Sequence, residues 1–356
     1  MLSFNEIFAD STKYCKKIKT DEYHETGKNM IVDQGQSEIA GYTDLEEGLF
    51  SDVPAIIFGD HTRIIKYVDK PFFIGADGVK VLKSKLEKAN YRYLYYALKN
   101  VKIPNTGYNR HFKWLKETIF NYPNSDRQQE IVLILDKLQS IITHLRTQLE
   151  KLDLLVKSRF VEMFGNIENM CTIADVCSII TDGTHQPPKF TTDGIPFLFV
   201  SNIATNEIVY NAEKFISEET YNDLYKRTPI EIGDIILSTV GSYGHPAIVK
   251  TNKKFLFQRH IAYLKPIPTT INSIYLHRAI LSDNVQRQID ERVKGIAQKT
   301  LNLSEIRKIV IPAPPLELQT QFANFAKQVD QSKSILQQEL TQTQTLFNSL
   351  MQEYFG

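Results

Sequence analysis

An internal repeat constrains the fold of this chain more than any other feature. Two segments align without a gap at an offset of 191 residues, because Gln128 matches Gln319 (319 − 128 = 191), and both segments end in the pattern Ser-x-x-x-Glu-x-Phe-Gly. Upstream, YLYYAL from Tyr93 matches YLHRAI from Tyr275 at an offset of 182. The drift indicates loop insertions, and copies of this length are domains rather than the short units of a solenoid.

Each copy ends in a long amphipathic helix. Apolar residues recur every three or four positions over residues 131–163, and the second copy repeats this spacing after Pro315. Ser125 followed by Gln128 fits a capping box, and Gly165 stands where a C-terminal glycine belongs. Such helices measure roughly 50 to 55 Å at about 1.5 Å per residue. An antiparallel coiled coil between the copies is therefore favoured over a long core helix inside one domain.

The regions before the helices combine short β-rich runs with glycine-containing turns and helical stretches. Strands are expected at residues 55–58, 72–74, 235–237 and 255–257, and helices at 91–98 and 274–283. We therefore expect an α+β fold with pseudo-two-fold symmetry. Its globular domains span residues 1–123 and 166–311, and its coiled-coil helices span 124–165 and 312–356.

The net charge of +1 hides a pattern that recurs in both copies. Residues 1–60 hold 5 Lys/Arg and 12 Asp/Glu, whereas residues 61–120 hold 13 and 4. Residues 166–244 hold 4 and 11, whereas residues 245–310 hold 12 and 4. This polarity predicts one basic face in each copy, and basic faces are suited to binding nucleic acid.

Composition excludes several classes of protein. No apolar run approaches the roughly 18 residues that a membrane span requires. The first residues lack the basic flank, apolar core and cleavage site of a secretory signal, so we expect a cytoplasmic protein. Cys15, Cys171 and Cys177 form no C-x-x-C pair, which disfavours a disulfide framework or a structural zinc site and favours reduced, buried thiols.

No motif supports a catalytic role for the chain. The Pro-Pro pairs at 187–188 and 314–315 lack the flanking residues of the loop with which base methyltransferases hold a flipped base. Glycine-rich motifs for S-adenosylmethionine or ATP phosphates do not occur, and the eight histidines form no metal-binding pair. We expect no catalytic residue, no metal site and no enzyme activity of the chain's own.

Six sequence strings resemble the specificity subunit of type I restriction-modification systems. They are IVDQG from Ile31, IIFGDHTR from Ile56, FFIGADGVKVL from Phe72, ITDGTH from Ile180, GDIILSTVGSYG from Gly233 and IPAPPLELQ from Ile311. The resemblance covers essentially the whole chain, including the order of target-recognition domain, spacer helix, second recognition domain and second helix. One departure is NYPNS at residues 121–125, which replaces the Pro-Pro-Leu run that the second copy retains. The chain is also short for the family.

The resemblance implies a mechanism. Each recognition domain would read one half of a split site in double-stranded DNA, and the helices would fix the unread spacer and dock two modification subunits. S-adenosylmethionine, ATP and Mg would belong to the modification and restriction subunits, and this chain would hold no cofactor. Two alternatives stay open: the recognition subunit of another restriction class, whose partner carries both nuclease and methylase activity, and a scaffold that has lost DNA binding.

In the first copy, the GDHTR turn is the leading candidate for DNA contact, because glycine allows close backbone approach and an arginine offers a bidentate fork. The alternative is a capped structural turn, in which the aspartate and histidine bond each other or the backbone. The candidates for base or phosphate contact are Gly59, Asp60, His61, Thr62, Arg63, Tyr108, Asn109, Arg110 and His111, with Lys66 and Lys80 assigned to phosphate.

In the second copy, polar residues in glycine-rich or loop-like segments are the candidates. Each of them also fits an ordinary solvated surface. They are Thr184, His185, Ser201, Asn202, Ser242, Tyr243, Gln258, Arg259, Gln298 and Lys299, with Lys250 and Lys254 assigned to phosphate.

Overall fold

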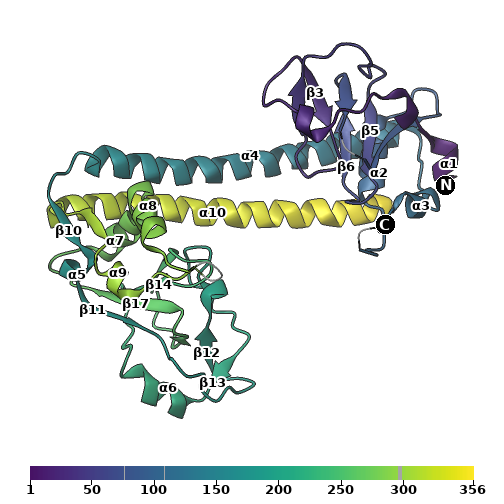
Figure 1. The fold of residues 1–356 in the computed structure, drawn as a ribbon. Coiled ribbons are helices and arrows are strands. Elements are labelled where there is room, and N and C mark those ends of the chain that lie inside the picture. The colour runs from purple at the N-terminus through teal and green to yellow at the C-terminus, as the bar shows by residue number, and fades with distance from the viewer. Residues whose placement is uncertain (76, 108, 296–298) are drawn as a thin grey trace. The chain divides into compact units, whose positions relative to one another are not determined.

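The computed structural model describes residues 1–75, 77–107, 109–295 and 299–356, which divide into two compact units. Unit 1 comprises Met1–Arg146 and Gln338–Gly356, and unit 2 comprises Thr147–Gln337. Each unit combines a globular part with sections of two long helices, α4 (Ser125–Phe164) and α10 (Leu316–Phe355) (Figure 1). Within the described residues, no helix combines the length and apolar character needed to cross a membrane.

Unit 1 contains two sheets and a two-stranded ladder. The antiparallel four-stranded sheet has the order β2 (Phe8–Asp10), β8 (Val79–Ser84), β5 (Ala55–Gly59), β6 (Ile65–Val68). The three-stranded sheet has the order β4 (Gly41–Thr43), β3 (Asn29–Val32), β7 (Phe72–Ile74), and its strands β3 and β7 run parallel. The ladder pairs β1 (Leu2–Ser3) with β9 (Ile119–Phe120). The helices are α1 (Phe4–Ile7), α2 (Tyr91–Lys99) and α3 (Phe112–Lys116), with short 3₁₀ helices at Thr12–Tyr14 and Thr20–Glu22.

Unit 2 repeats this topology. Its four-stranded sheet has the order β11 (Cys177–Asp182), β17 (Ile261–Pro266), β14 (Ile235–Ser238), β15 (Pro246–Ile248). Its three-stranded sheet has the order β13 (Phe215–Ile216), β12 (Ile195–Leu198), β16 (Leu256–Phe257), again with a parallel pair, β12 and β16. The ladder pairs β10 (Met170–Thr172) with β18 (Val310–Pro312). The helices are α5 (Ile173–Val176), α6 (Glu218–Tyr225), α7 (Ser273–Ile280), α8 (Asp283–Arg292) and α9 (Leu303–Ile306), with a 3₁₀ helix at Val200–Asn202.

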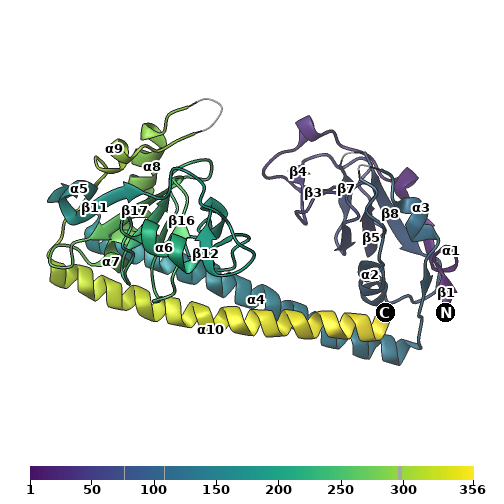
Figure 2. The same ribbon diagram turned by 90° about the horizontal axis from the view of Figure 1, so that it is seen from below.

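Local hydrogen bonds repeat between the units as well. Asn90 caps α2 by accepting from the main-chain N–H of Tyr93 at 3.1 Å, and Asn272 caps α7 by accepting from that of Tyr275 at 3.2 Å. Both tyrosine hydroxyls donate a 2.8 Å hydrogen bond to the main chain at or just after the last strand of the unit. Figure 2 shows α2 and α7 lying between the sheets of their own units and the long helices. The predicted repeat is confirmed.

The long helices pack against each other in an antiparallel manner. In unit 1, Leu135 and Ile142 from the first half of α4 share a buried cluster with Phe347 from the second half of α10. In unit 2, the rings of Phe160 in α4 and Phe322 in α10 meet edge to face with centroids 5.4 Å apart. This packing confirms the predicted α+β fold with two long helices that pair as a coiled coil.

The start of α4 differs from the predicted capping box. Asn124, not Ser125, caps the helix, because its Oδ1 accepts from the main-chain N–H of Arg127 at 3.0 Å. Gln128 instead donates to the main-chain oxygen of Pro123 at 2.8 Å. The helix contains 40 residues, or about 60 Å, so it is longer than the apolar spacing alone indicated.

The predicted strands lie in β5, β7, β14 and β16, and the predicted helix at residues 91–98 lies in α2. The segment 274–283 was predicted as one helix, but it is divided. Helix α7 ends at Ile280, and Ser282 caps the separate helix α8 through its Oγ. Helices α6 and α8 have no counterpart in the described part of unit 1. Of the two, only α8 lies between the matched segments at residues 275 and 319, so α8 accounts for the drift of the repeat offset from 182 to 191.

Gln128 and Gln319 are buried at equivalent positions of the two copies, and replacing each of them measures what it contributes to the stability of its unit. Gln319 is 2% exposed, accepts from the main-chain N–H of Asn272 at 2.9 Å and donates to the oxygen of Pro314 at 2.9 Å. Replacing Gln319 with Ala leaves buried main-chain groups without partners, so we expect a loss of about 2 to 3 kcal/mol in free energy of unfolding. Gln128→Ala is the control and should cost about 1 kcal/mol, because it removes one such bond. Hydrogen exchange of α7 and α2 during urea titration measures both, and equal losses would contradict the prediction.

Candidate nucleic-acid interface

Loops that follow β3, β5 and β7 meet at one end of unit 1. Parallel strands end at the same sheet edge, so the loops after β3 and β7 emerge together. Gln34 joins them: its Nε2 donates to the main-chain oxygen of Asp77 at 2.7 Å, and its Oε1 accepts from the main-chain N–H of His61 at 3.1 Å. The hydroxyl of Thr62 donates to the main-chain oxygen of Gln34 at 2.7 Å. Gln34 therefore connects the loops that follow β3, β5 and β7.

Glycine is required at two positions of this loop cluster. A Cβ on Gly59 would lie 2.2 Å from Oγ1 of Thr62 and 2.9 Å from Cβ of Gln34. Gly78 has a φ of +84°, and a Cβ there would meet the ring of His61 at 2.6 Å. Close packing of the turns against each other explains these glycines, and it leaves little side-chain bulk between the backbone and an approaching ligand.

Arg63 adopts the left-handed backbone region, with a φ of +62°. This conformation costs a non-glycine residue about 1 to 2 kcal/mol. It is fixed by a 2.7 Å hydrogen bond from the main-chain N–H of Arg63 to the oxygen of Gly59, and the guanidinium donates to the main-chain oxygen of Ile103 at 3.4 Å. Strained residues of this kind concentrate at functional sites.

Four of the predicted contact residues in unit 1 are buried, and one of them is Gly59, the last residue of β5, which packs against Thr62 and Gln34. Asp60 is 4% exposed, and its Oδ1 accepts from the main-chain N–H of Phe112 at 2.7 Å. His111 is fully buried, with Nδ1 2.9 Å from the main-chain oxygen of Asp60. Lys66 is 2% exposed, occupies an inward position of β6 and donates to the main-chain oxygen of Ser37 at 2.5 Å. These side chains support the turns from inside, so they are removed from the candidate contacts.

The other candidates in unit 1 reach the surface. Thr62, Asn109 and Arg110 are exposed, and His61 and Arg63 are half-buried. Lys17, bonded at 2.7 Å, lowers the pKa of Asp77, and Arg110 and His61 add to this effect from nearby. Lys80 is 29% exposed and pairs with Asp10 at 3.0 Å. Tyr108 lies outside the described residues.

The same sheet edge in unit 2 carries a matching loop cluster. The main-chain N–H of Thr184 donates to the oxygen of Phe257 at 3.1 Å, and the N–H of Arg259 donates to the oxygen of Thr184 at 3.1 Å. A Cβ on the glycine before Thr184 would lie 2.2 Å from the oxygen of Phe257. The N–H of Gly241 donates to the oxygen of Lys299 at 3.2 Å. In unit 2, main-chain hydrogen bonds connect these loops, whereas in unit 1 the Gln34 side chain connects them.

One predicted contact in unit 2 is buried. Asn202 is 9% exposed, and its Nδ2 donates to the main-chain oxygens of Val209 at 3.0 Å and Asn211 at 3.2 Å, so it shapes its own loop. Tyr243 donates to Asp290 at 3.0 Å. The exposed candidates are His185, Ser201, Ser242, Arg259, Lys299, Lys250 and Lys254, the half-buried ones are Thr184, Tyr243 and Gln258, and Gln298 lies outside the described residues.

Sequence reasoning missed two residues of these clusters. Gln34 belongs to the IVDQG string, and its place directly after a parallel strand was a usable signal. Arg227 follows α6 and donates to Asp182 at 2.6 Å, while Nε2 of His185 lies 3.1 Å from the same carboxylate. Arg227 had no sequence signal, because the inserted segment that carries it has no counterpart in the first copy.

Part of the charge split of the sequence is offset by ion pairs inside each unit. Residues from the acidic segment of each copy lie close to residues from the basic segment, both across neighbouring strands, as Asp10 of β2 and Lys80 of β8 do, and between strands and loops. The pairs in unit 1 are Lys66–Asp33 at 3.5 Å, Lys80–Asp10 at 3.0 Å and Lys83–Asp52 at 2.7 Å. The pairs in unit 2 are Lys250–Glu207 at 2.8 Å, Lys265–Glu231 at 2.7 Å and Lys254–Glu218. No group of three or more potential metal ligands occurs among the described residues.

Comparison with known proteins identifies the family. Residues 4–153 and 168–344 match the family model described as the type I restriction modification DNA specificity domain. The chain belongs to this family. The matched ranges fall in the two copies of the repeat, so each copy is one specificity domain.

Among curated relatives, the specificity subunit of the type I restriction enzyme EcoBI from Escherichia coli is 28% identical over 171 residues. That alignment covers 48% of this chain and 36% of the relative, so it spans about a third of the relative's length. The specificity subunit of the type I restriction enzyme MjaVIII from Methanocaldococcus jannaschii is 22% identical over 315 residues, covering 78% of this chain and 74% of the relative.

Solved structures show the same fold. The crystal structure of a type I restriction-modification S subunit from M. genitalium aligns with a TM-score of 0.63 and 16% identity, covering 99% of this chain and 95% of that one. A chain from a study of complex assembly and conformational transition in a type I system aligns with a TM-score of 0.53 and 14% identity, with the same coverage. At these identities, the likeness establishes the architecture of paired specificity domains and long helices.

A buried histidine in α7 of unit 2 gives a pH prediction. Nε2 of His277 lies 3.1 Å from the oxygen of Pro246 and 3.3 Å from that of Asn206, and burial lowers the pKa of His277 from 6.5 to about 4. Below pH 6.5 the unfolded chain binds a proton that the folded chain excludes, so unit 2 loses stability as the pH falls toward 4, by up to about 3 kcal/mol. In His277→Gln, the pH dependence of the urea midpoint for α7 should flatten by this amount. An unchanged slope between pH 7.5 and 4.5 would contradict the assignment.

Proposed function

We propose that this chain is the DNA sequence-specificity subunit of a type I restriction-modification complex, and that each unit recognises one half of a bipartite DNA site. The observation that carries the proposal is the duplicated loop cluster at the same sheet edge of two specificity domains. Both clusters bring loop backbones together through tight glycine contacts and place polar side chains on the surface. Such surfaces can contact base edges and phosphates together.

The proposed contacts are the candidates whose side chains or backbone remain available. Arginine forks suit guanine, and amide side chains such as that of Asn109 suit adenine. In unit 1 the proposed set is His61, Thr62, Arg63, Lys80, Tyr108, Asn109 and Arg110, and the buried Gly59 is left out. In unit 2 it is Thr184, His185, Ser201, Ser242, Tyr243, Gln258, Arg259, Gln298 and Lys299, to which we add the exposed Arg227 because it lies beside His185 on Asp182.

We further propose that α4 and α10 dock two modification subunits and set the spacer between the half-sites. Large apolar side chains stay exposed on both helices. In unit 1 these are Leu133 at 71% and Leu346 at 50%, and in unit 2 they are Leu154 at 63%, Val161 at 66% and Ile335 at 60%. Exposed apolar residues that gather along a helix mark protein interaction surfaces.

In this proposal the chain itself does no chemistry. Methyl transfer to adenine takes place on the modification subunits with S-adenosylmethionine, and ATP- and Mg-dependent translocation and cleavage take place on the restriction subunits. The complex acts on double-stranded DNA in the cytoplasm. What this chain contributes is the choice of sequence.

Two arginines test the assignment of one half-site to each unit. Arg110→Ala removes an exposed cation from the unit 1 cluster, and Arg259→Ala does the same in unit 2. We expect each variant to lose about 1 to 3 kcal/mol of discrimination at one half of the site only. The readout is the adenine-methylation pattern of cells that carry the chain with its partner subunits, supported by gel shifts on duplexes altered in one half.

Deleting the gene should abolish methylation at one bipartite motif. If no such motif disappears, the proposed function fails. If each arginine variant impairs both halves equally, the division of labour between the units fails while DNA recognition stands.

The spacer role is tested by lengthening both helices together. Inserting seven helical residues into α4 after Arg146 and seven into α10 after Gln337 keeps the heptad phase and adds roughly 10 Å. We expect the preferred spacer to grow by up to about three base pairs while both half-site sequences stay the same. Methylation mapping measures this, and an unchanged spacer in a folded, active complex would exclude the ruler role.

A further inference from the structure

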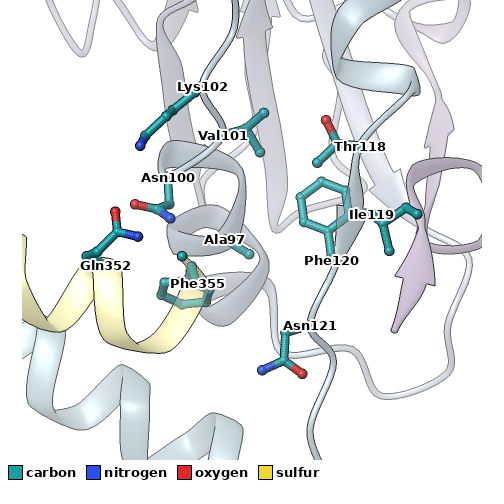
Figure 3. A pocket seen from close by; sticks show the side chains of 11 residues that line it. Ala97, Asn100, Val101, Lys102, Thr118, Ile119, Phe120, Asn121, Gln352 and Phe355 are labelled. Carbon is teal, nitrogen blue, oxygen red and sulfur yellow. The ribbon is translucent and has the colours of Figure 1, made fainter.

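A cavity of about 350 Å³ lies in unit 1 beside strand β9, and it shares no residue with the candidate nucleic-acid interface. Its walls come from the end of α2 and the residues after it, from β9 and its neighbours, and from the last turn of α10 (Figure 3). Ile119 and Lys102 line it, and the Ile119 side chain is 62% exposed. A strand edge that combines an exposed apolar side chain with unpaired main-chain groups is a ready site for pairing with another chain.

The main-chain edge of Ile119 points away from its ladder. The N–H of Phe4 donates to the oxygen of Thr118 at 3.0 Å, so Phe4 and Thr118 form a hydrogen-bonded pair. Pairs alternate along an antiparallel ladder, so the next pair, Ser3 with Ile119, is not hydrogen-bonded. The N–H and C=O of Ile119 are therefore directed outward, on the side of the strand away from β1.

In unit 2, helix α8 covers the equivalent edge. Val310 corresponds to Ile119 (310 − 119 = 191), and it sits in the same ladder, because Ile173 donates to Ile309 at 2.9 Å as Phe4 does to Thr118. The side chain of Gln288 satisfies both outward groups: Nε2 donates to the oxygen of Val310 at 2.8 Å, and Oε1 accepts from its N–H at 2.9 Å. Gln288 of α8 thus satisfies the main-chain groups at the outer edge of β18.

Unit 1 has no such helix in its described part. Asn100 corresponds to Ser282 (282 − 100 = 182), the residue that caps α8. Beyond Asn100 the chain of unit 1 continues without a helix until α3, and the cavity opens at residues 100–102. The second copy therefore shows what kind of helix covers this edge. On α8, Val285 and Ile289 lie on either side of Gln288 and are 1% and 0% exposed, so they bury the helix against the unit.

We propose that this cavity is a docking site for an amphipathic helix of another protein chain. The helix presents a glutamine to the main chain of Ile119, apolar side chains three residues before and one after the glutamine to the cavity, and an acidic first turn to the exposed Lys102. These are the features of α8, whose first turn carries Asp283. Since an isolated helix of this length is marginal in water, the occupant is a preformed helix on a folded partner.

The probe for this site is a fluorescein-labelled peptide with the sequence of residues 282–293, stapled between positions 287 and 291, which are exposed in unit 2. Anisotropy titration against the full chain should show saturable one-to-one binding. A peptide carrying Gln288→Leu cannot bond the strand edge, so its affinity should fall about tenfold.

In the protein, Ile119→Glu should also weaken peptide binding about tenfold. The matched control is Ile39→Glu, which alters another exposed isoleucine of unit 1 that lies outside the cavity and should bind as the wild type does. Absence of saturable binding, or equal binding by Ile119→Glu and wild type, overturns the proposal. If Ile119→Glu fails to fold, a photo-crosslinker on the wild-type peptide locates where the peptide binds. Crosslinks found only outside the cavity would also overturn the proposal.

This site stands apart from DNA recognition. Arg110→Ala should retain full peptide affinity, so failure of the docking site and failure of the proposed DNA function appear in separate measurements.

Discussion

The structure depends on an exchange of helices between the two copies of the repeat. The buried cluster of unit 1 includes Phe347 and Met351 of α10, and the cluster of unit 2 includes Phe160 and Phe164 of α4. Each globular part thus completes its core with the helix that belongs to the other copy. Aromatic contacts carry this exchange, with Tyr93 5.2 Å from Phe355 in unit 1 and Tyr275 4.9 Å from Phe164 in unit 2. Because aromatic pairs of this kind add about 0.5 to 1.5 kcal/mol beyond their burial, neither copy reaches full stability alone.

Periodicity and repetition predicted most of the fold, since both are properties of the chain that packing preserves. The N-cap of α4 and the division between α7 and α8 were not predictable, because Asn124, Ser125 and Ser282 are all good capping residues and tertiary contacts decide which of them serves. The C-terminal end of α4 was predicted, since the helix ends at Phe164, directly before Gly165. The candidate site was predictable only as loops. Asp60 and His111 look like ligand contacts in sequence, yet each is polar for an internal reason, to satisfy buried main-chain groups.

Counting charges along the sequence overestimates how basic the surface of each unit is. The acidic and basic segments of each copy lie close together in the fold, so some of their side chains form ion pairs, and the exposed pairs contribute little net energy. The cations outside these pairs include Arg110 and Arg259, which lie on exposed loops close to glycine-containing turns. Such an interface depends on geometry more than on net charge, in keeping with a chain whose overall charge is +1.

The two units share one topology, but they have diverged in what covers it. Unit 2 uses its inserted helices twice: α6 leads to Arg227 at the loop cluster, and α8 closes the edge of β18 through Gln288. Unit 1 joins its loops through the Gln34 side chain without a described counterpart of α6, and its described residues include no helix that covers the edge of β9. Outward N–H and C=O groups on a strand edge tend to recruit a pairing partner. Since the fold accommodates a covering helix at this position in one copy, a helix from a partner chain can cover the open edge of the other copy without rearrangement of its strand.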